Sequence, residues 1–317
     1  MTSPRTLHFM VIDTMTATAF TGNPTPVFIL DHLEGWLTVE CMQLLAREMN
    51  QSETVFLRRL QAPDPSAYAV RWFTPYAEEP FCGHGVVAAA IALHQTHGLS
   101  SVKFEAFGGV KLSAVVAPST SQAGAATVVM TLPSEPVDQT LDGAGTVKRD
   151  FARALGIREE DVVAIGRNSL MDVVLELDPR VDFSATNMEI DPVKLLKASP
   201  ARTRSQVVTG AWGRGTFDFA KRVFAYGSED QATGSTYCVL APYWAAKLGK
   251  KNLRAVQTSA RRGEANLVLK EKEGLVEVCA DGIKTIEGDI LYPDIARSTN
   301  LAQAKLRNRV SGSIGSV

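Results

Sequence analysis

The sequence predicts an α+β protein built from two similar halves. Short stretches with the pattern of β-strands outnumber stretches with helical periodicity. A length of 317 residues suits two domains of about 150 residues better than one domain. A pattern of strand, acidic loop, glycine and helix also occurs twice along the chain. These three observations together favour two structurally related domains.

In the first half, a pair of strands is followed by alternating helices and strands. The residues Thr21-Gly22-Asn23-Pro24 favour a turn that connects the first two strands. Apolar residues at helical spacing predict a helix over 37–49, and a second helix is expected over 84–96. Residues 50–57 form a polar opening that runs into a strand. The other strands are expected at 7–13, 25–30, 68–74, 101–107 and 110–117.

A polar stretch rich in glycine, serine and proline at 118–126 predicts a domain boundary. We therefore expect one domain over 1–122, joined by part of the C-terminal segment, and a second over 123–317. Residues 298–317 are polar and are expected to fray. The second half is predicted to contain helices at 148–155, 191–198 and 234–248, and strands at 161–166, 171–177, 206–211, 216–224, 265–271 and 274–279.

The internal repeat appears when the chain is shifted by 151 residues, which places residues 71–90 over a second segment without a gap. In this alignment Glu79 faces Asp230, and Cys82 faces Thr233. The identical pairs are Arg71 with Arg222, Phe73 with Phe224, Glu78 with Glu229, Gly83 with Gly234, and Ala90 with Ala241.

Each copy of the repeat predicts a helix that starts at a glycine. The first turn of a helix has unpaired N–H groups and a partial positive charge, and glycine lets a ligand approach the backbone closely. Two such helix starts facing each other across a cleft would hold an anion, most simply a carboxylate. Acidic or thiol side chains in the same loops would lie beside the carbon that carries the carboxylate. This layout suits the movement of a proton at that carbon.

Four segments carry a family resemblance. They are DTMTATAFTGNPTPVF at 13–28, NQSETVF at 50–56, FTPYAEEPFCGHG at 73–85 and SEDQATGS at 228–235. Their order and spacing resemble the PhzF-like isomerases of phenazine biosynthesis, which belong to the diaminopimelate epimerase fold superfamily. The resemblance covers most of the chain.

This resemblance implies two domains, each a β-barrel-like sheet around a central helix, with the active site in the cleft between them. It implies that Glu53 is the proton shuttle and that His84, Asp230 and Ser235 belong to the site. Members of the family work without a metal or an organic cofactor and are commonly homodimers. A role in secondary metabolism is also implied.

One residue departs from the family pattern. PhzF-like proteins usually have a non-thiol residue where this chain has Cys82, and the PFCGHG segment resembles the first catalytic cysteine of proline racemases and diaminopimelate epimerases. The opposite position holds Thr233, and a cysteine paired with a threonine resembles hydroxyproline dehydratases. Either Glu53 or Cys82 therefore remains open as the base.

Each candidate also has an ordinary structural explanation. Glu53 could be a surface carboxylate or a helix cap, and Cys82 a small buried apolar residue. His84 could be an exposed residue at a helix start, and Asp230 a favourable charge near a helix N-terminus. Asn23 is expected to be a turn residue that also lines the cleft. Gly83 and Gly234 fit tight turns, and Thr233, Gly234 and Ser235 are the counterparts of 82–84 in the second copy.

Composition excludes several classes of function. The net charge of −1 and the scattered Lys and Arg residues do not favour a nucleic-acid partner. The sequence has no apolar run of 18 residues and no apolar core near Met1 typical of a signal peptide, so we expect no membrane span. The cysteines Cys41, Cys82, Cys238 and Cys279 lack the spacing of disulfide frameworks or zinc sites, which favours a cytoplasmic protein without metal.

The leading hypothesis is a cofactor-independent isomerase that moves a C–H proton on a small carboxylic acid, with Glu53 as general base and acid. A Cys82-dependent amino-acid racemase, epimerase or dehydratase is the alternative chemistry. A ligand-binding protein without turnover is the alternative of another class.

Overall fold

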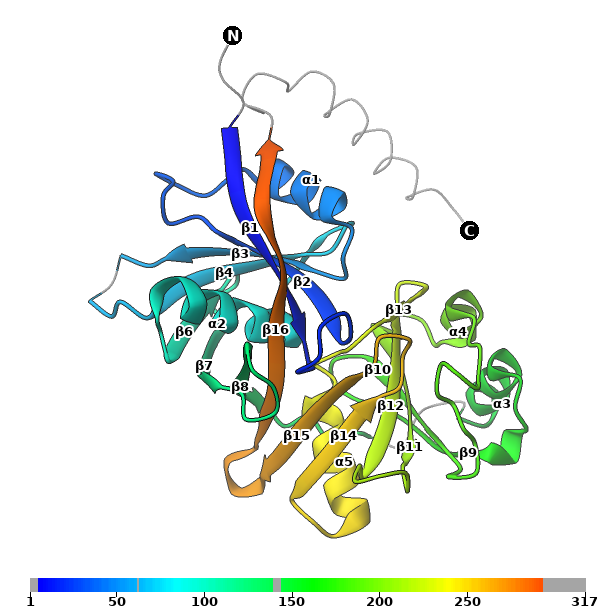
Figure 1. Cartoon of the computed structure of the whole chain (residues 1–317). Helices are drawn as coiled ribbons and strands as arrows, with labels where there is room; N and C mark the ends of the chain where they lie inside the picture. The colour runs from blue at the N-terminus through cyan, green and yellow to red at the C-terminus, as the bar shows by residue number, and fades with distance from the viewer. Residues whose placement is uncertain (1–4, 62, 139–143, 293–317) are drawn as a thin grey trace, which may run out of the picture.

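The computed structural model describes residues 5–61, 63–138 and 144–292, and it confirms the α+β class. Within these residues all five expected helices are present, and the strands form one continuous sheet. The sheet is closed at one end and open at the other, which divides the molecule into two lobes (Figure 1). None of the helices in the described residues is long and apolar enough to span a membrane.

The first lobe is a closed barrel of eight strands. It closes because the last strand pairs with both the first strand and the eighth. Its strands, in order around the barrel, are β1 (Arg5–Thr14), β2 (Asn23–Ile29), β3 (Thr54–Arg59), β4 (Ala67–Phe73), β6 (Ser101–Ala106), β7 (Lys111–Pro118), β8 (Ala125–Pro133) and β16 (Leu275–Tyr292).

Helix α2 (Gly83–His97) lies inside this barrel. Its first eleven residues, GHGVVAAAIAL, are all buried, so this part of the helix has no side facing solvent and needs no polar face. Small alanine side chains let the helix fit a closed barrel while favouring helical backbone. Helix α1 (Val39–Met49) packs outside, against β3 and β4.

The second lobe continues the sheet from β16 but remains open. Its central helix α5 (Tyr237–Leu248) is apolar on all sides and contacts β14, β15 and β16. Helices α3 (Ala144–Leu155) and α4 (Pro192–Ala198) pack together in a second core. The strands, in order from β16, are β15 (Gly263–Lys270), β14 (Asn252–Gln257), β12 (Phe219–Ala225), β11 (Ser205–Ala211), β10 (Asp172–Leu177) and β9 (Val162–Arg167).

Strand β16 joins the two lobes, and this part of the fold differs from the sequence prediction. A strand was expected only at 274–279, but β16 runs on through 292 to pair with β1. The extension is mostly half-buried or exposed and contains two glycines, so it lacks an alternating apolar pattern. Strands β8 and β14 were also not expected. The division into domains at residues 122 and 123 stays a prediction, and β8 completes the first barrel.

The internal repeat corresponds to a repeated structure. Arg71 on β4 forms a two-bond ion pair with Glu78 on β5 (Glu78–Glu79), with N–O distances of 2.7 and 2.6 Å. Arg222 on β12 pairs with Glu229 on β13 (Ser228–Asp230) at the same two distances. In both lobes this short antiparallel pair leads directly to the start of the central helix.

The two helix starts meet backbone to backbone. A Cβ atom added to Gly83 would lie 2.6 Å from the Ser235 nitrogen, and one added to Gly234 would lie 2.9 Å from the Gly83 carbonyl carbon. Only glycine fits at either position, because the neighbouring atoms are backbone. Helix α5 begins at Tyr237 rather than at Gly234 as expected, since residues 234–236 form a tighter turn with i to i+3 hydrogen bonds.

Replacing Gly83 with alanine should therefore destabilise the protein by about 1–3 kcal/mol, because the added methyl group must push two backbone segments apart. Chemical denaturation measures this change. Gly35→Ala is the matched control, since a Cβ at Gly35 meets nothing within 4 Å, and its effect should stay within about 0.5 kcal/mol. Equal stability of the two variants would contradict the close contact.

Candidate functional site

A cavity of about 80 Å³ lies where the two helix starts meet, and residues from both lobes line it. Seven of the residues predicted from the sequence are among its walls: Glu53, Cys82, Gly83, His84, Asp230, Thr233 and Ser235. Asn23 and Gly234 do not line it. Asn23 is fully buried and hydrogen bonds to Asp230, and Gly234 contacts Gly83 behind the wall.

Glu53, His84 and Cys82 form a compact cluster in the first lobe. Glu53 directly precedes β3, and its Oε2 atom lies 2.9 Å from Nε2 of His84. The Sγ atom of Cys82 lies 3.5 Å from both ring nitrogens of His84. Oε2 of Glu53 is buried but accepts no well-directed hydrogen bond from the described residues. Glu53 is a wall residue of the cavity, and His84 is the ion-pair partner of this oxygen.

The protonation states within this cluster follow from burial and neighbouring charge. Burial by itself lowers the pKa of His84, but the adjacent Cys82 and Glu53 raise it, and the net pKa lies well above 6.5. Burial, and next the Glu53 carboxylate, raises the pKa of the Cys82 thiol to about 11. These directions favour a positively charged His84 and a protonated Cys82 sulfur.

Cys82 also has a structural role. It is the N-cap of α2, and its sulfur accepts a hydrogen bond from the Gly85 N–H at 3.2 Å. Gly85 leaves room for this bond, since a Cβ there would lie 3.0 Å from the sulfur and 2.6 Å from the Trp72 ring. The cysteine thus satisfies one of the N–H groups that a helix start leaves unpaired.

Asp230 accepts hydrogen bonds from side chains of both lobes. Its Oδ1 atom accepts hydrogen bonds from Asn23 Nδ2 at 2.7 Å and from the Ser52 hydroxyl at 3.1 Å. Its Oδ2 atom accepts one from the Thr233 hydroxyl at 2.6 Å. Asn23 Nδ2 also lies 3.4 Å from Nδ1 of His84, which connects the two clusters.

A buried lysine supports the turn that begins α5. Lys221 donates from Nζ to the Thr233 carbonyl and, at 2.6 Å, to the Thr236 hydroxyl. Burial lowers the pKa of Lys221 well below its usual value, against the attraction of Asp230. The sequence did not indicate that Lys221 is buried near the site, because a single lysine in an apolar strand is typical of an exposed edge strand.

The helix starts leave backbone donors open. The N–H groups of Gly83, His84, Gly234 and Ser235 donate no hydrogen bond to the described residues. Gly83, His84 and Ser235 are residues of the cavity wall. The carboxylate-binding layout predicted from the repeat is therefore compatible with the geometry.

Five polar residues of the wall were missed as site residues: Glu79, Arg204, Ser205, Tyr226 and Thr236. Tyr226 donates to Glu79 at 3.4 Å, and burial, then repulsion from Glu53, raises the pKa of Glu79. Arg204 is held by two hydrogen bonds to the buried Asp172, at 2.8 and 2.6 Å. Glu79 was visible only as the repeat partner of Asp230. No local signal marks Arg204 or Tyr226, because long-range strand pairing brings them to the site.

Glu53, Cys82 and His84 are also the one group within the described residues with ligand atoms for a metal ion, all within 4.8 Å of one another. Carboxylate, thiolate and imidazole are zinc ligands, but a thiol with a raised pKa must lose its proton first. The absence of a metal stays a prediction.

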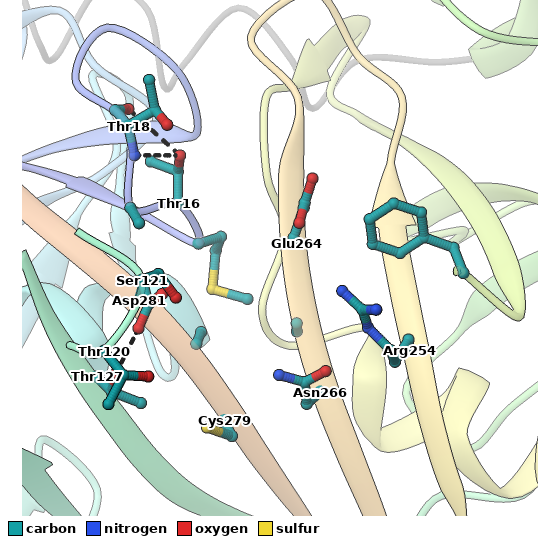
Figure 2. A pocket seen from close by; sticks show the side chains of 15 residues that line it. Thr16, Thr18, Thr120, Ser121, Thr127, Arg254, Glu264, Asn266, Cys279 and Asp281 are labelled. Atoms are coloured by element: carbon teal, nitrogen blue, oxygen red, sulfur yellow. Dashed lines mark hydrogen bonds between the residues drawn. The ribbon is translucent and has the colours of Figure 1, made fainter. Parts of the chain in front are cut away.

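A second cavity, of about 330 Å³, is larger but contains none of the predicted site residues. Its walls come from β8, β14, β15 and β16 and from the loop after β1 (Figure 2). Threonine and serine hydroxyls lie on one side, and Glu264, Asn266 and Arg254 on the other. We place the candidate site in the smaller cavity, because it has the paired acid and imidazole.

Comparisons with known proteins identify the family of this chain. A family model described as "Phenazine biosynthesis-like protein" (PhzC-PhzF) matches residues 12–287. The mouse phenazine biosynthesis-like domain-containing protein 2 is 33% identical over 90% of this chain and 99% of its own length. An uncharacterized isomerase of Pseudomonas aeruginosa is 33% identical over 81% of this chain and 89% of its own. The structure of a PhzF family protein from Enterococcus faecalis superposes with a TM-score of 0.73 at 24% identity, covering 90% of this chain and 99% of that one. The chain therefore belongs to the PhzC-PhzF family of phenazine biosynthesis-like proteins.

Proposed function

We propose that this protein is an isomerase that moves a C–H proton on a small carboxylic acid, with Glu53 as the general base and acid. The proposal rests mainly on one observation. Oε2 of Glu53 is buried beside the cavity and 2.9 Å from His84, yet accepts no well-directed hydrogen bond. Glu53 lines the cavity and His84 holds its carboxylate in place, which is the position that a general base for a bound molecule requires. Family membership, with relatives named as isomerases, supports an isomerase-type enzyme.

The substrate carboxylate would accept hydrogen bonds from the open N–H groups of Gly83, His84 and Ser235 in the cavity wall. This binding places the adjacent carbon near Glu53. Its C–H bond breaks, the proton forms an O–H bond on Glu53, and the electron pair is delocalised toward the carboxylate. Glu53 then returns the proton to a second carbon of the same molecule, which shares this electron pair through a conjugated C=C bond, and that double bond shifts.

His84 and Asp230 would assist without taking the substrate proton first. The positive charge of His84 lies next to Glu53 and to the developing negative charge. Asp230 fixes Asn23 and Thr233 and orients the substrate from the second lobe. Homodimerisation and independence of cofactors stay predictions from the family resemblance, and a cytoplasmic location stays a prediction from the cysteine pattern.

The Cys82 alternative needs a thiolate. The raised pKa of Cys82 and its hydrogen bond to Gly85 instead favour a protonated sulfur that caps the helix. The racemase-type reaction is therefore the second candidate.

Glu53→Gln should reduce proton exchange by about 10²- to 10⁴-fold, because the amide keeps the shape but cannot act as a base. The measurement follows exchange of C–H protons in heavy water by NMR, over a panel of small amino and hydroxy acids. Cys82→Ser is the matched variant, since its hydroxyl can still cap α2, and should keep most of the activity. The reverse order of losses would support the thiol mechanism. Tight binding with no exchange by the wild type would support a non-catalytic binding protein.

His84 should titrate with a pKa above 6.5, and Glu53→Gln should lower that pKa because it removes the adjacent negative charge. Since the pKa is raised on folding, the resulting stability is fully present below pH 6.5 and is lost as pH rises through the folded-state pKa. NMR titration of the imidazole, assigned with His84→Asn, provides the measurement. A His84 pKa below 6.5 in the wild type would contradict the charged pair.

A further inference from the structure

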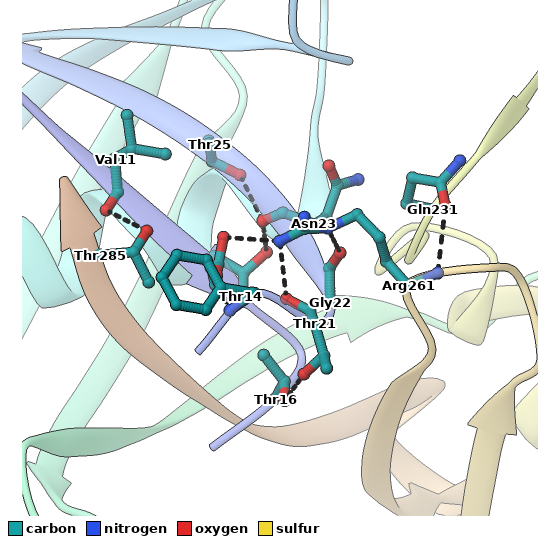
Figure 3. A network of polar contacts seen from close by, with 12 residues as sticks. Val11, Thr14, Thr16, Thr21, Gly22, Asn23, Thr25, Gln231, Arg261 and Thr285 are labelled. Carbon is teal, nitrogen blue, oxygen red and sulfur yellow. Dashed lines mark hydrogen bonds and ion pairs between the residues drawn. The ribbon is translucent and has the colours of Figure 1, made fainter. Parts of the chain in front are cut away.

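The loop between β14 and β15 reaches across to the turn between β1 and β2, and Arg261 makes the contact (Figure 3). Its Nε donates to the Gly22 carbonyl at 2.9 Å. Its Nη2 donates to Asp13 Oδ1 at 3.0 Å and to the Thr21 carbonyl at 3.2 Å. In return, the Gly22 N–H donates to the carbonyls of Arg261 and Arg262, at 2.7 and 2.8 Å.

The turn that Arg261 holds is itself fixed. Gly22 has a φ of +67°, and a Cβ there would lie 2.1 Å from the Thr14 carbonyl oxygen, so no other residue fits. Asp13 is buried, and its Oδ2 accepts a hydrogen bond from the Phe20 N–H at 2.6 Å. Because the Asp13 carboxylate binds both Phe20 and Arg261, it joins the turn to the second lobe by a charged contact.

The next residue after this turn belongs to the candidate site. Asn23 donates from Nδ2 to Asp230 Oδ1 at 2.7 Å and to the Ala232 carbonyl at 3.2 Å. The turn therefore lies between two segments of the second lobe, 258–262 on one side and 230–232 on the other. Gln231 connects these segments by accepting a hydrogen bond from the Arg261 N–H at 3.3 Å.

We propose that Arg261 is a positioning residue that fixes Gly22 and thereby places the Asn23 amide against Asp230 and His84. Arg261 does not line the cavity, so it acts on the site only through this turn. Without it, the turn can move away from the second lobe, and the partly buried Asp230 loses one of its donors. The effect on catalysis rests on the proposed function, whereas the effect on the turn does not.

Arg262 provides a matched control. Its carbonyl accepts from the same Gly22 N–H, but its side chain pairs with Glu264 at 3.0 Å, away from the turn. Replacement of either arginine with methionine keeps the backbone contacts and removes one guanidinium. Only the Arg261 change removes the contact with Asp13.

Hydrogen exchange measured by mass spectrometry on the full chain tests the positioning without any substrate. Arg261→Met should speed exchange about tenfold in peptides covering 14–25 and 228–236 and leave other peptides unchanged. Arg262→Met should match the wild type in every peptide. Unchanged exchange in both segments of Arg261→Met would overturn the proposal, and so would a rise throughout the chain, since that indicates a general stabilising role.

Kinetics test whether the effect reaches the site through Asn23. With the panel acid that exchanges fastest, Arg261→Met should lower kcat about 10- to 100-fold with a smaller change in KM, and Arg261→Lys should restore part of the loss. In an Asn23→Ala background, Arg261→Met should cause no further loss. An equal loss in both backgrounds would overturn the role through Asn23. If the wild type exchanges no C–H proton of any acid, the proposed function fails. The backbone hydrogen exchange of Arg261→Met still decides whether Arg261 positions the turn.

Discussion

The contact between Gly83 and Gly234 is the constraint on which the rest of the structure depends. Each central helix is buried in its own sheet, so its direction is fixed by the packing of apolar residues around it. The two helices can meet at their N-termini only if neither carries a side chain there. This contact leaves open N–H groups together at one point, a favourable place for a negative charge. It also brings the Glu53 cluster of one lobe beside the Asp230 cluster of the other.

The surroundings of Glu53 and Cys82 explain why these two groups differ in their suitability as a base, although both lie beside His84. Cys82 is buried and caps a helix, so its sulfur is held as a neutral acceptor. Glu53 lies at the end of a loop, lines the cavity and forms an ion pair with His84 through Oε2. Burial and helix capping therefore distinguish Cys82 from Glu53, although the sequence left both as candidates for the base. The geometry favours Glu53 as the base and leaves Cys82 a structural role.

The parts of this structure that were predictable from the sequence are those with local signals. Helix α2 has a continuous apolar run, and the repeat aligned Arg71 with Arg222 and Glu78 with Glu229, which form equivalent ion pairs. The parts that were missed depend on long-range pairing. The extension of β16 is stabilised by β1, whose paired residues lie 268 to 287 positions away in sequence. Arg204 reaches the cavity through the pairing of β10 with β11. Asn23 was expected to line the cleft, but the second lobe covers it, which the turn motif alone does not indicate.

A crystal structure with bound lactate, a small acid with one C–H beside its carboxylate, tests the central claim most directly. We predict that the carboxylate lies on the N–H groups of Gly83, His84 and Ser235. Oε2 of Glu53 should then be closer to the α-carbon than the Sγ atom of Cys82. Lactate with its α-carbon nearer the sulfur, or lactate bound only in the larger cavity beside Glu264, would contradict the account.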